Sequence, residues 1–136
     1  MKQSLLAIYF LLATSAALAS PHRVVVEVNI PGAIGYGIVV NNIENLRKAF
    51  APEPVQVEIV CHGDGIGMLR RDKNKLAERM SKLSEAGVVF AACANTLKGK
   101  NIDRKTLFPF IQVVKSGVYE VVRKQEAGWS YLKGAY

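Results

Sequence analysis

Short β-branched runs alternate along the chain with segments of helical periodicity, and this alternation restricts the possible folds more than any other feature. Five runs are predicted as strands, at residues 23–30, 55–61, 88–93, 110–115 and 129–133. In the second run Val57, Ile59 and Cys61 share one side, which is the period-two spacing of a strand. Strands separated by helices pair in parallel through right-handed crossovers. We therefore expect an α/β fold of three layers, with a mainly parallel five-stranded sheet between helices.

Apolar residues spaced by three or four positions predict the helices between these strands. The stripes consist of Val39, Ile43, Leu46 and Phe50, then Leu76, Met80 and Leu83, and last Val118, Val121 and Val122. Gly87 and Gly128 follow the second and third stripes, and glycine commonly ends helices. Ser116 is placed to cap the last helix, and Asp103 to cap a short helix in the preceding loop. The glycine-rich residues 63–67 predict a flexible loop.

Residues 1–19 have the pattern of an export signal rather than of a folded element. Lys2 precedes an apolar run at residues 5–12, and Ala17-Leu18-Ala19 matches the small-residue pattern of a cleavage site. The alternative is an uncleaved membrane anchor, which the short length of the run disfavours. We expect cleavage after Ala19, one domain over residues 20–136, a periplasmic or secreted location, and no stable membrane anchor after cleavage.

The chain is basic, with a formal net charge of +7 from 18 Lys and Arg against 11 Asp and Glu. Such a balance attracts anions. The basic residues are spread along the chain and aromatic residues do not interleave with them, so the pattern is not that of a nucleic-acid-binding protein. We expect no nucleic acid as a partner.

Two cysteines offer the most distinctive chemistry, because each ends a predicted strand. Ligands and catalytic groups of open α/β sheets lie beyond the carboxyl ends of the strands. After Cys93 come the small residues Ala94 and Asn95, which allow a tight turn whose amides favour a thiolate. The alternatives are a buried structural thiol and a disulfide with Cys61. A disulfide requires that the second and third strands be neighbours.

A second cluster, His62, Gly63 and Gly65, follows Cys61 directly. The glycines allow an anion or a thiol to approach the backbone, and His62 can serve as a base, as a hydrogen-bond partner or as a structural residue. The segment lacks the Lys-Ser/Thr ending of a phosphate-binding loop. Cys61 and His62 are adjacent in the chain and point to opposite faces, so we expect no metal site and no cofactor.

Four ordered segments carry a resemblance to a known family. They are NNIENL at residues 41–46, HGDGIGML at 62–69, CANTL at 93–97 and VVKSGVYEVVRKQEAGWSYLK at 113–133. Together they resemble the DsrE/DsrF-like family over nearly all of residues 23–136. The resemblance implies a parallel five-stranded sheet between helices and a homo-oligomer, either a trimer or a hexamer. It also implies a sulfur relay in which Cys93 matches the cysteine that carries a persulfide.

The first functional hypothesis is an exported sulfur carrier or sulfurtransferase-like protein. Cys93 would accept sulfur from a donor persulfide and pass it to a thiol of an acceptor protein. Backbone amides, together with His62, Asn95 and Thr96, would stabilise the anionic persulfide. A free Cys93 thiol of low pKa favours this hypothesis.

The second hypothesis is a non-enzymatic, oligomeric binding module for a small anion or a partner protein. Its cleft would be lined by His62, Gly63, Gly65 and Asn95. The cysteines would then be structural or joined in a disulfide, and a buried bridge between them favours this second hypothesis.

Overall fold

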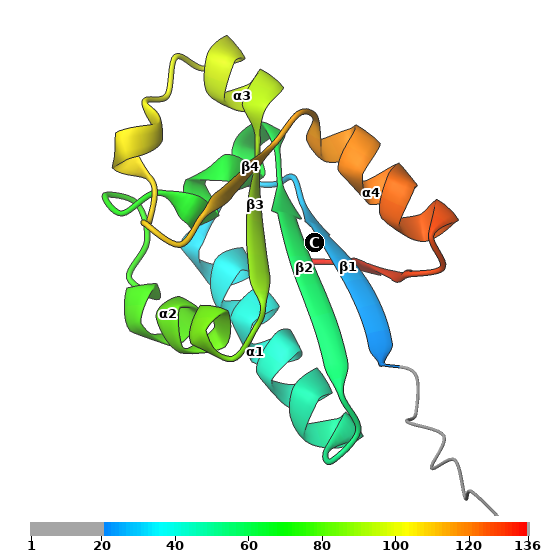
Figure 1. Ribbon diagram of the computed structural model, residues 1–136. Coiled ribbons are helices and arrows are strands. Elements are labelled where there is room, and N and C mark those ends of the chain that lie inside the picture. Colours follow the sequence, from blue (N-terminus) through cyan, green and yellow to red (C-terminus); the bar gives the residue numbers. More distant parts are fainter. Residues whose placement is uncertain (1–20, 136) are drawn as a thin grey trace, which may run out of the picture.

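A computed structural model describes residues 21–135 of the chain (Figure 1). The elements are β1 (His22–Val28), α1 (Ala33–Phe50), β2 (Val55–Cys61), the 3₁₀ helix η1 (Gly63–Leu69), α2 (Ala77–Glu85), β3 (Val89–Cys93), α3 (Ala94–Gly99), the 3₁₀ helix η2 (Arg104–Thr106), β4 (Gln112–Val114), α4 (Gly117–Glu126) and β5 (Ser130–Lys133). The predicted export signal, residues 1–19, lies outside the described residues. Within the described part, no helix is both long and apolar enough to cross a membrane.

The five strands form one sheet in the order β4-β3-β2-β1-β5, and every pair is parallel. The chain steps from β1 to β4 in one direction and then returns to place β5 beside β1. Right-handed crossovers put the helices of the outward steps on one face and the helix of the return step on the other. Figure 1 shows this arrangement, with α1 and α2 on one side of the sheet and α4 on the opposite side. The predicted α/β fold with a parallel five-stranded sheet is confirmed.

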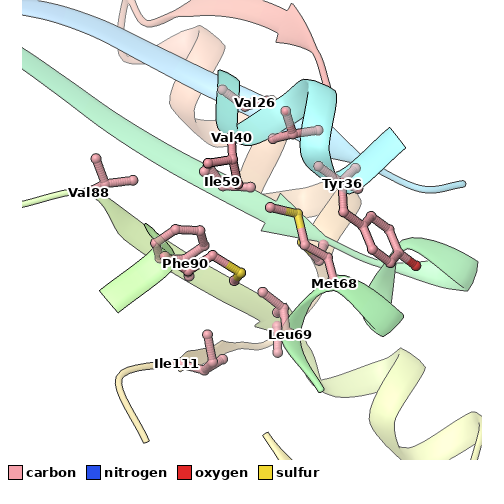
Figure 2. Close-up of a cluster of buried hydrophobic side chains, with 14 of the residues drawn as sticks. Val26, Tyr36, Val40, Ile59, Met68, Leu69, Val88, Phe90 and Ile111 are labelled. Atoms are coloured by element: carbon pink, nitrogen blue, oxygen red, sulfur yellow. The ribbon is translucent and has the colours of Figure 1, made fainter. Parts of the chain in front are cut away.

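The two faces of the sheet are packed very differently. Val24, Val26 and Val28 point toward α1 and α2, where they join a large core. Figure 2 shows part of this core, to which Phe90 and Met68 contribute large side chains. The opposite face carries a small apolar cluster of Val25, Val60, Ala91 and Val121 beneath α4. The α4 side of the sheet therefore has room for polar groups that the α1 side lacks.

Most predicted boundaries agree with the structure, and the strand ends differ for physical reasons. β1 was expected to reach residue 30 but ends at Val28, whose carbonyl accepts a hydrogen bond from the His62 amide at 3.0 Å. Pro31, which has no amide proton, then leads the chain into α1. β4 is confined to three residues at the sheet edge, where only one neighbour provides hydrogen bonds. Ser116 does cap α4, as predicted.

The glycine-rich segment after β2 is not a flexible loop, and that prediction was wrong. Residues 63–69 form η1, in which Ile66, Met68 and Leu69 are buried. A Cβ atom on Gly65 would lie 2.1 Å from the Val28 carbonyl oxygen, so the glycine allows close packing against the end of β1. The segment after Cys93 was likewise expected to begin as a loop, but α3 begins immediately.

Candidate functional site

Cys93 lies at the carboxyl end of β3, on the face of the sheet that α4 covers. Ala92 belongs to the main core and Ala91 to the small cluster under α4, so the alternation of side chains puts Cys93 on the α4 side. Cys93 is also the residue that caps α3, and its sulfur accepts a hydrogen bond from the Thr96 amide at 3.4 Å. Cys93 as a residue is 5% exposed. The thiol therefore lies where β3 ends and where α3 and α4 begin.

Hydrogen-bond donors surround this sulfur. The Thr96 hydroxyl oxygen accepts a bond from the Gly63 amide at 3.0 Å, which leaves its proton to be donated to the sulfur. Burial raises the pKa of the Cys93 thiol, but the Thr96 hydroxyl and the amides of Gly117, Thr96 and Asn95 outweigh it and lower the pKa below its ordinary value. The arrangement stabilises a sulfur anion, which is the nucleophilic form of cysteine.

Cys61 ends the neighbouring strand but lies in a different environment. It pairs with Ala92 in the sheet and points into the main core, where it is completely buried. Burial raises the pKa of the Cys61 thiol far above its ordinary range. β2 and β3 are neighbours, as a disulfide would require, yet the two thiols face opposite sides of the sheet, and both cysteines are free.

The structure brings only part of the predicted cluster together around Cys93. Thr96 and Gly63 take part in the hydrogen bonds just described, and His62 lies on the same side of the sheet. The Asn95 side chain is exposed, so this residue contributes its amide and not its carboxamide. Gly65 is buried against β1 and does not line an open cleft. The four residues expected to line the cleft of the binding module therefore differ in exposure, from the exposed Asn95 to the buried Gly65.

Three residues of the site were missed by sequence reasoning: Glu27, Tyr131 and Gly117. The His62 Nε2 atom lies 2.6 Å from Glu27 Oε1, and the Tyr131 hydroxyl donates to Glu27 Oε2 at 2.5 Å. A Cβ on Gly117 would lie 2.8 Å from the His62 Cβ, so the start of α4 packs directly on His62. The sequence did contain one indication that Glu27 has a special role, because it is a charged residue between two valines of a strand.

A buried ion pair lies beneath the middle of α4. The Lys124 Nζ atom is 2.5 Å from Glu58 Oε2 and 4.1 Å from the centre of the Trp129 ring. Burial raises the pKa of the Glu58 carboxyl, against the lowering effect of Lys124. Among residues 21–135, no three His, Cys, Asp or Glu side chains are grouped so that they would hold a metal ion. The polar groups of this face thus pair with one another.

Comparisons with known proteins agree with the fold. The sequence model of the DsrE/DsrF-like family matches residues 7–133. A solved structure, that of the protein of unknown function MTH1491 from Methanobacterium thermoautotrophicum, superposes with a TM-score of 0.77. It is 33% identical in sequence, and the match covers 82% of this chain and 98% of that one. No match was found among curated proteins.

Proposed function

Because this chain belongs to the DsrE/DsrF-like family, which is associated with sulfur relay, we propose that it is a sulfur carrier that holds sulfur as a persulfide on Cys93. The observation that carries the proposal is the set of donors around the Cys93 sulfur, in which the Thr96 hydroxyl and three amides favour the anion. Such donors stabilise both a thiolate before transfer and a persulfide anion after it.

The transfer consists of two exchange steps without net oxidation. The Cys93 thiolate attacks the outer sulfur of a donor persulfide, R–S–SH. A bond forms between Sγ and that sulfur, the donor S–S bond breaks, and the donor leaves as the thiolate R–S⁻. The outer sulfur on Cys93 then loses its proton to water. An acceptor thiol, as thiolate, later attacks the outer sulfur, and Cys93 leaves as a thiolate again.

The proposal includes export and self-assembly. The predicted signal at residues 1–19 would place the protein in the periplasm or outside the cell, where donor and acceptor would be exported thiol proteins or persulfides. Val118, Tyr119 and Val122 are about half exposed on α4. A trimer or hexamer that covers these side chains would also remove apolar surface from water.

Intact mass spectrometry tests the sulfur carrier directly. The protein is purified without reductant, incubated with glutathione persulfide, freed of small molecules and weighed. We expect the gain of one sulfur atom, reversed by reductant and mapped to Cys93. Cys93→Ser should abolish the gain, while the matched variant Cys61→Ser should retain it. A wild-type protein that takes up no sulfur, or one that takes it up equally in Cys93→Ser, would contradict the proposal.

A second candidate is the binding of an anionic small molecule, and a groove of about 580 Å³ favours it. The groove lies beside the start of α1 and is lined by Pro31, Gly32, Ala33, Tyr36, Asp64, Ile66, Gly67, Arg70, Lys73, Lys100 and Ile102. Of its three cations, Arg70 pairs with Asp72 and Lys100 pairs with Asp64, so Lys73 supplies the positive excess of the groove. Isothermal titration with inorganic phosphate and sulfate tests it. We expect measurable binding heat with at least one anion and less heat with the variant Lys73→Ala. If neither anion produces heat, phosphate and sulfate are excluded as ligands of the groove.

A further inference from the structure

Glu27 has both carboxylate oxygens in hydrogen bonds with residues of other strands. Oε1 contacts His62 Nε2 at 2.6 Å, just after β2, and Oε2 accepts from Tyr131 of β5 at 2.5 Å. The side chains of Glu27 and His62 are 19% and 16% exposed. Val25 and Tyr131 are register partners, and Val25 faces α4, so this group lies on the same side of the sheet as Cys93. Glu27, His62 and Tyr131 therefore form a polar group on the face of the sheet that also carries the Cys93 thiol.

The charge of Glu27 fixes which nitrogen of His62 carries a proton. Burial raises the pKa of Glu27, but the hydrogen bonds from Tyr131 and His62 and the charge of Lys133 outweigh it, and the pKa is lowered. An ionised carboxylate can only accept, so the proton in the contact with Glu27 belongs to Nε2 of the imidazole. In the neutral ring Nδ1 is then the acceptor.

His62 is connected to the thiol through the first residue of α4. The Gly117 amide donates to the Cys93 sulfur. The Gly117 Cα packs so closely on His62 that a Cβ would approach the imidazole carbons Cγ and Cδ2 to 3.2 Å. The position of the imidazole and the position of a donor to the sulfur therefore depend on each other.

We propose that Glu27 is a positioning residue for the thiol site: it holds the His62 imidazole against Gly117 in the Nε2-protonated form. Tyr131 fixes the second carboxylate oxygen and so completes the support. This inference rests on the proposed function for its biological meaning, since the sulfur to which the Gly117 amide donates would then be that of the carrier. What the inference itself asserts is limited to the tautomer of the His62 imidazole and the reactivity of the Cys93 thiol.

The test combines nitrogen NMR of the imidazoles with the rate of Cys93 alkylation by iodoacetamide as a function of pH. The chain has two histidines, so the signals of His62 and His22 can be compared directly. His22 Nε2 lies 2.8 Å from Glu53 Oε2 at the other end of the sheet, and this exposed pair serves as the matched control. In the wild type we expect His62 to show the Nε2-protonated signature. Glu27→Gln should produce a mixture of tautomers, change the shape of the pH profile and slow Cys93 alkylation about tenfold. Glu53→Gln should leave His62 and Cys93 unchanged.

The outcomes separate this inference from the sulfur-carrier proposal. If Glu27→Gln leaves the His62 signature and the pH profile of Cys93 as in the wild type, the inference is overturned, whether or not Cys93 accepts sulfur. If the wild type accepts no sulfur but Glu27→Gln changes both readouts, the inference stands and the carrier proposal fails. Should Glu27→Gln not fold, Tyr131→Phe keeps the carboxylate and removes one hydrogen bond. A smaller change of both readouts in the same direction is then expected, and no change overturns the inference.

Discussion

Cys61 and Cys93 end neighbouring parallel strands and both are buried, yet their thiols face opposite sides of the sheet and their pKa values shift in opposite directions. Cys61 pairs with Ala92 and Cys93 is the next residue along β3, so one step in the chain separates their positions in the sheet. That single step directs Cys61 into the main core, where burial raises its pKa, and Cys93 toward α4, where hydrogen bonds lower its pKa. Residue type and strand position alone therefore do not make a thiol reactive; the face of the sheet decides.

The same contrast extends over the two faces as wholes. The face toward α1 and α2 is a continuous apolar core, which supplies most of the hydrophobic stabilisation. The face toward α4 has a small apolar cluster and carries Cys93, Glu27 and Glu58, the last of which pairs with Lys124 of α4. One face stabilises the fold, and the other holds the thiol together with most of the buried polar groups. The following predictions test that division.

The largest expected effect is the difference between the two thiols in alkylation. Cys61 is fully buried within the main core and reacts only when that core opens, whereas Cys93 is 5% exposed and lies at the end of β3, outside the two apolar clusters. We expect iodoacetamide to modify Cys93 about 10³-fold faster than Cys61 at neutral pH. The reason is that Cys61 reacts only in the small fraction of molecules whose core is open, and about 10⁻³ is a high estimate of that fraction. Peptide mapping of the modified protein over time measures both rates. Comparable rates in the folded protein would show that the two thiols do not differ in accessibility or pKa. In urea, where the core is unfolded, Cys61 should become as reactive as Cys93.

Truncation of a core side chain should reveal the unequal contribution of the two faces to stability. Phe90→Ala removes a fully buried ring from the α1 side and should lower the free energy of unfolding by about 3–5 kcal/mol. Val121→Ala removes two methyl groups from the α4 side and should cost about 1.5 kcal/mol. Urea unfolding followed by circular dichroism measures both. A cost for Val121→Ala equal to that of Phe90→Ala would show that the α4 face stabilises the fold as strongly.

Two glutamates of the α4 face should give stability opposite dependences on pH. The pKa of Glu27 is lowered, so its stabilisation is present above the unfolded value of 4.5 and is lost as pH falls through the folded pKa. The pKa of Glu58 is raised, so its contribution is present below 4.5 and is lost as pH rises through the folded pKa.

We therefore expect the stability advantage of wild type over Glu27→Gln to grow as pH rises toward 4.5. The advantage over Glu58→Gln should shrink as pH rises above 4.5. Urea titrations at several pH values measure both differences. Two differences that move in the same direction would contradict the assignment of these carboxylates to opposite environments.

The fold was largely predictable from the sequence, and the site only in part, for an identifiable reason. The alternation in residues 55–61 gave β2 correctly because apolar periodicity records which side chains meet the core. The small residues after Cys93 predicted amides near its sulfur, but nothing in the sequence indicated that the amide of Gly117, from a distant segment, would also donate to it. Glu27 and Tyr131 are 104 residues apart, and only the pairing of β1 with β5 brings them together. The hydrophobic periodicity of the sequence predicts which segments are strands, but it does not predict which strands are neighbours in the sheet.

The smallest expected effect on stability concerns the outer side of α4. Val122 is 47% exposed there, and Ile34 is 84% exposed at the start of α1. Glutamate at either position should change the free energy of unfolding of the monomer by no more than about 0.5 kcal/mol. If copies of the chain assemble through α4, Val122→Glu should reduce the mass measured by light scattering after size-exclusion chromatography, while Ile34→Glu should not. Equal masses for wild type and Val122→Glu would mean that this side of α4 is not the assembly surface. The α4 face would then hold the thiol site without also joining the subunits.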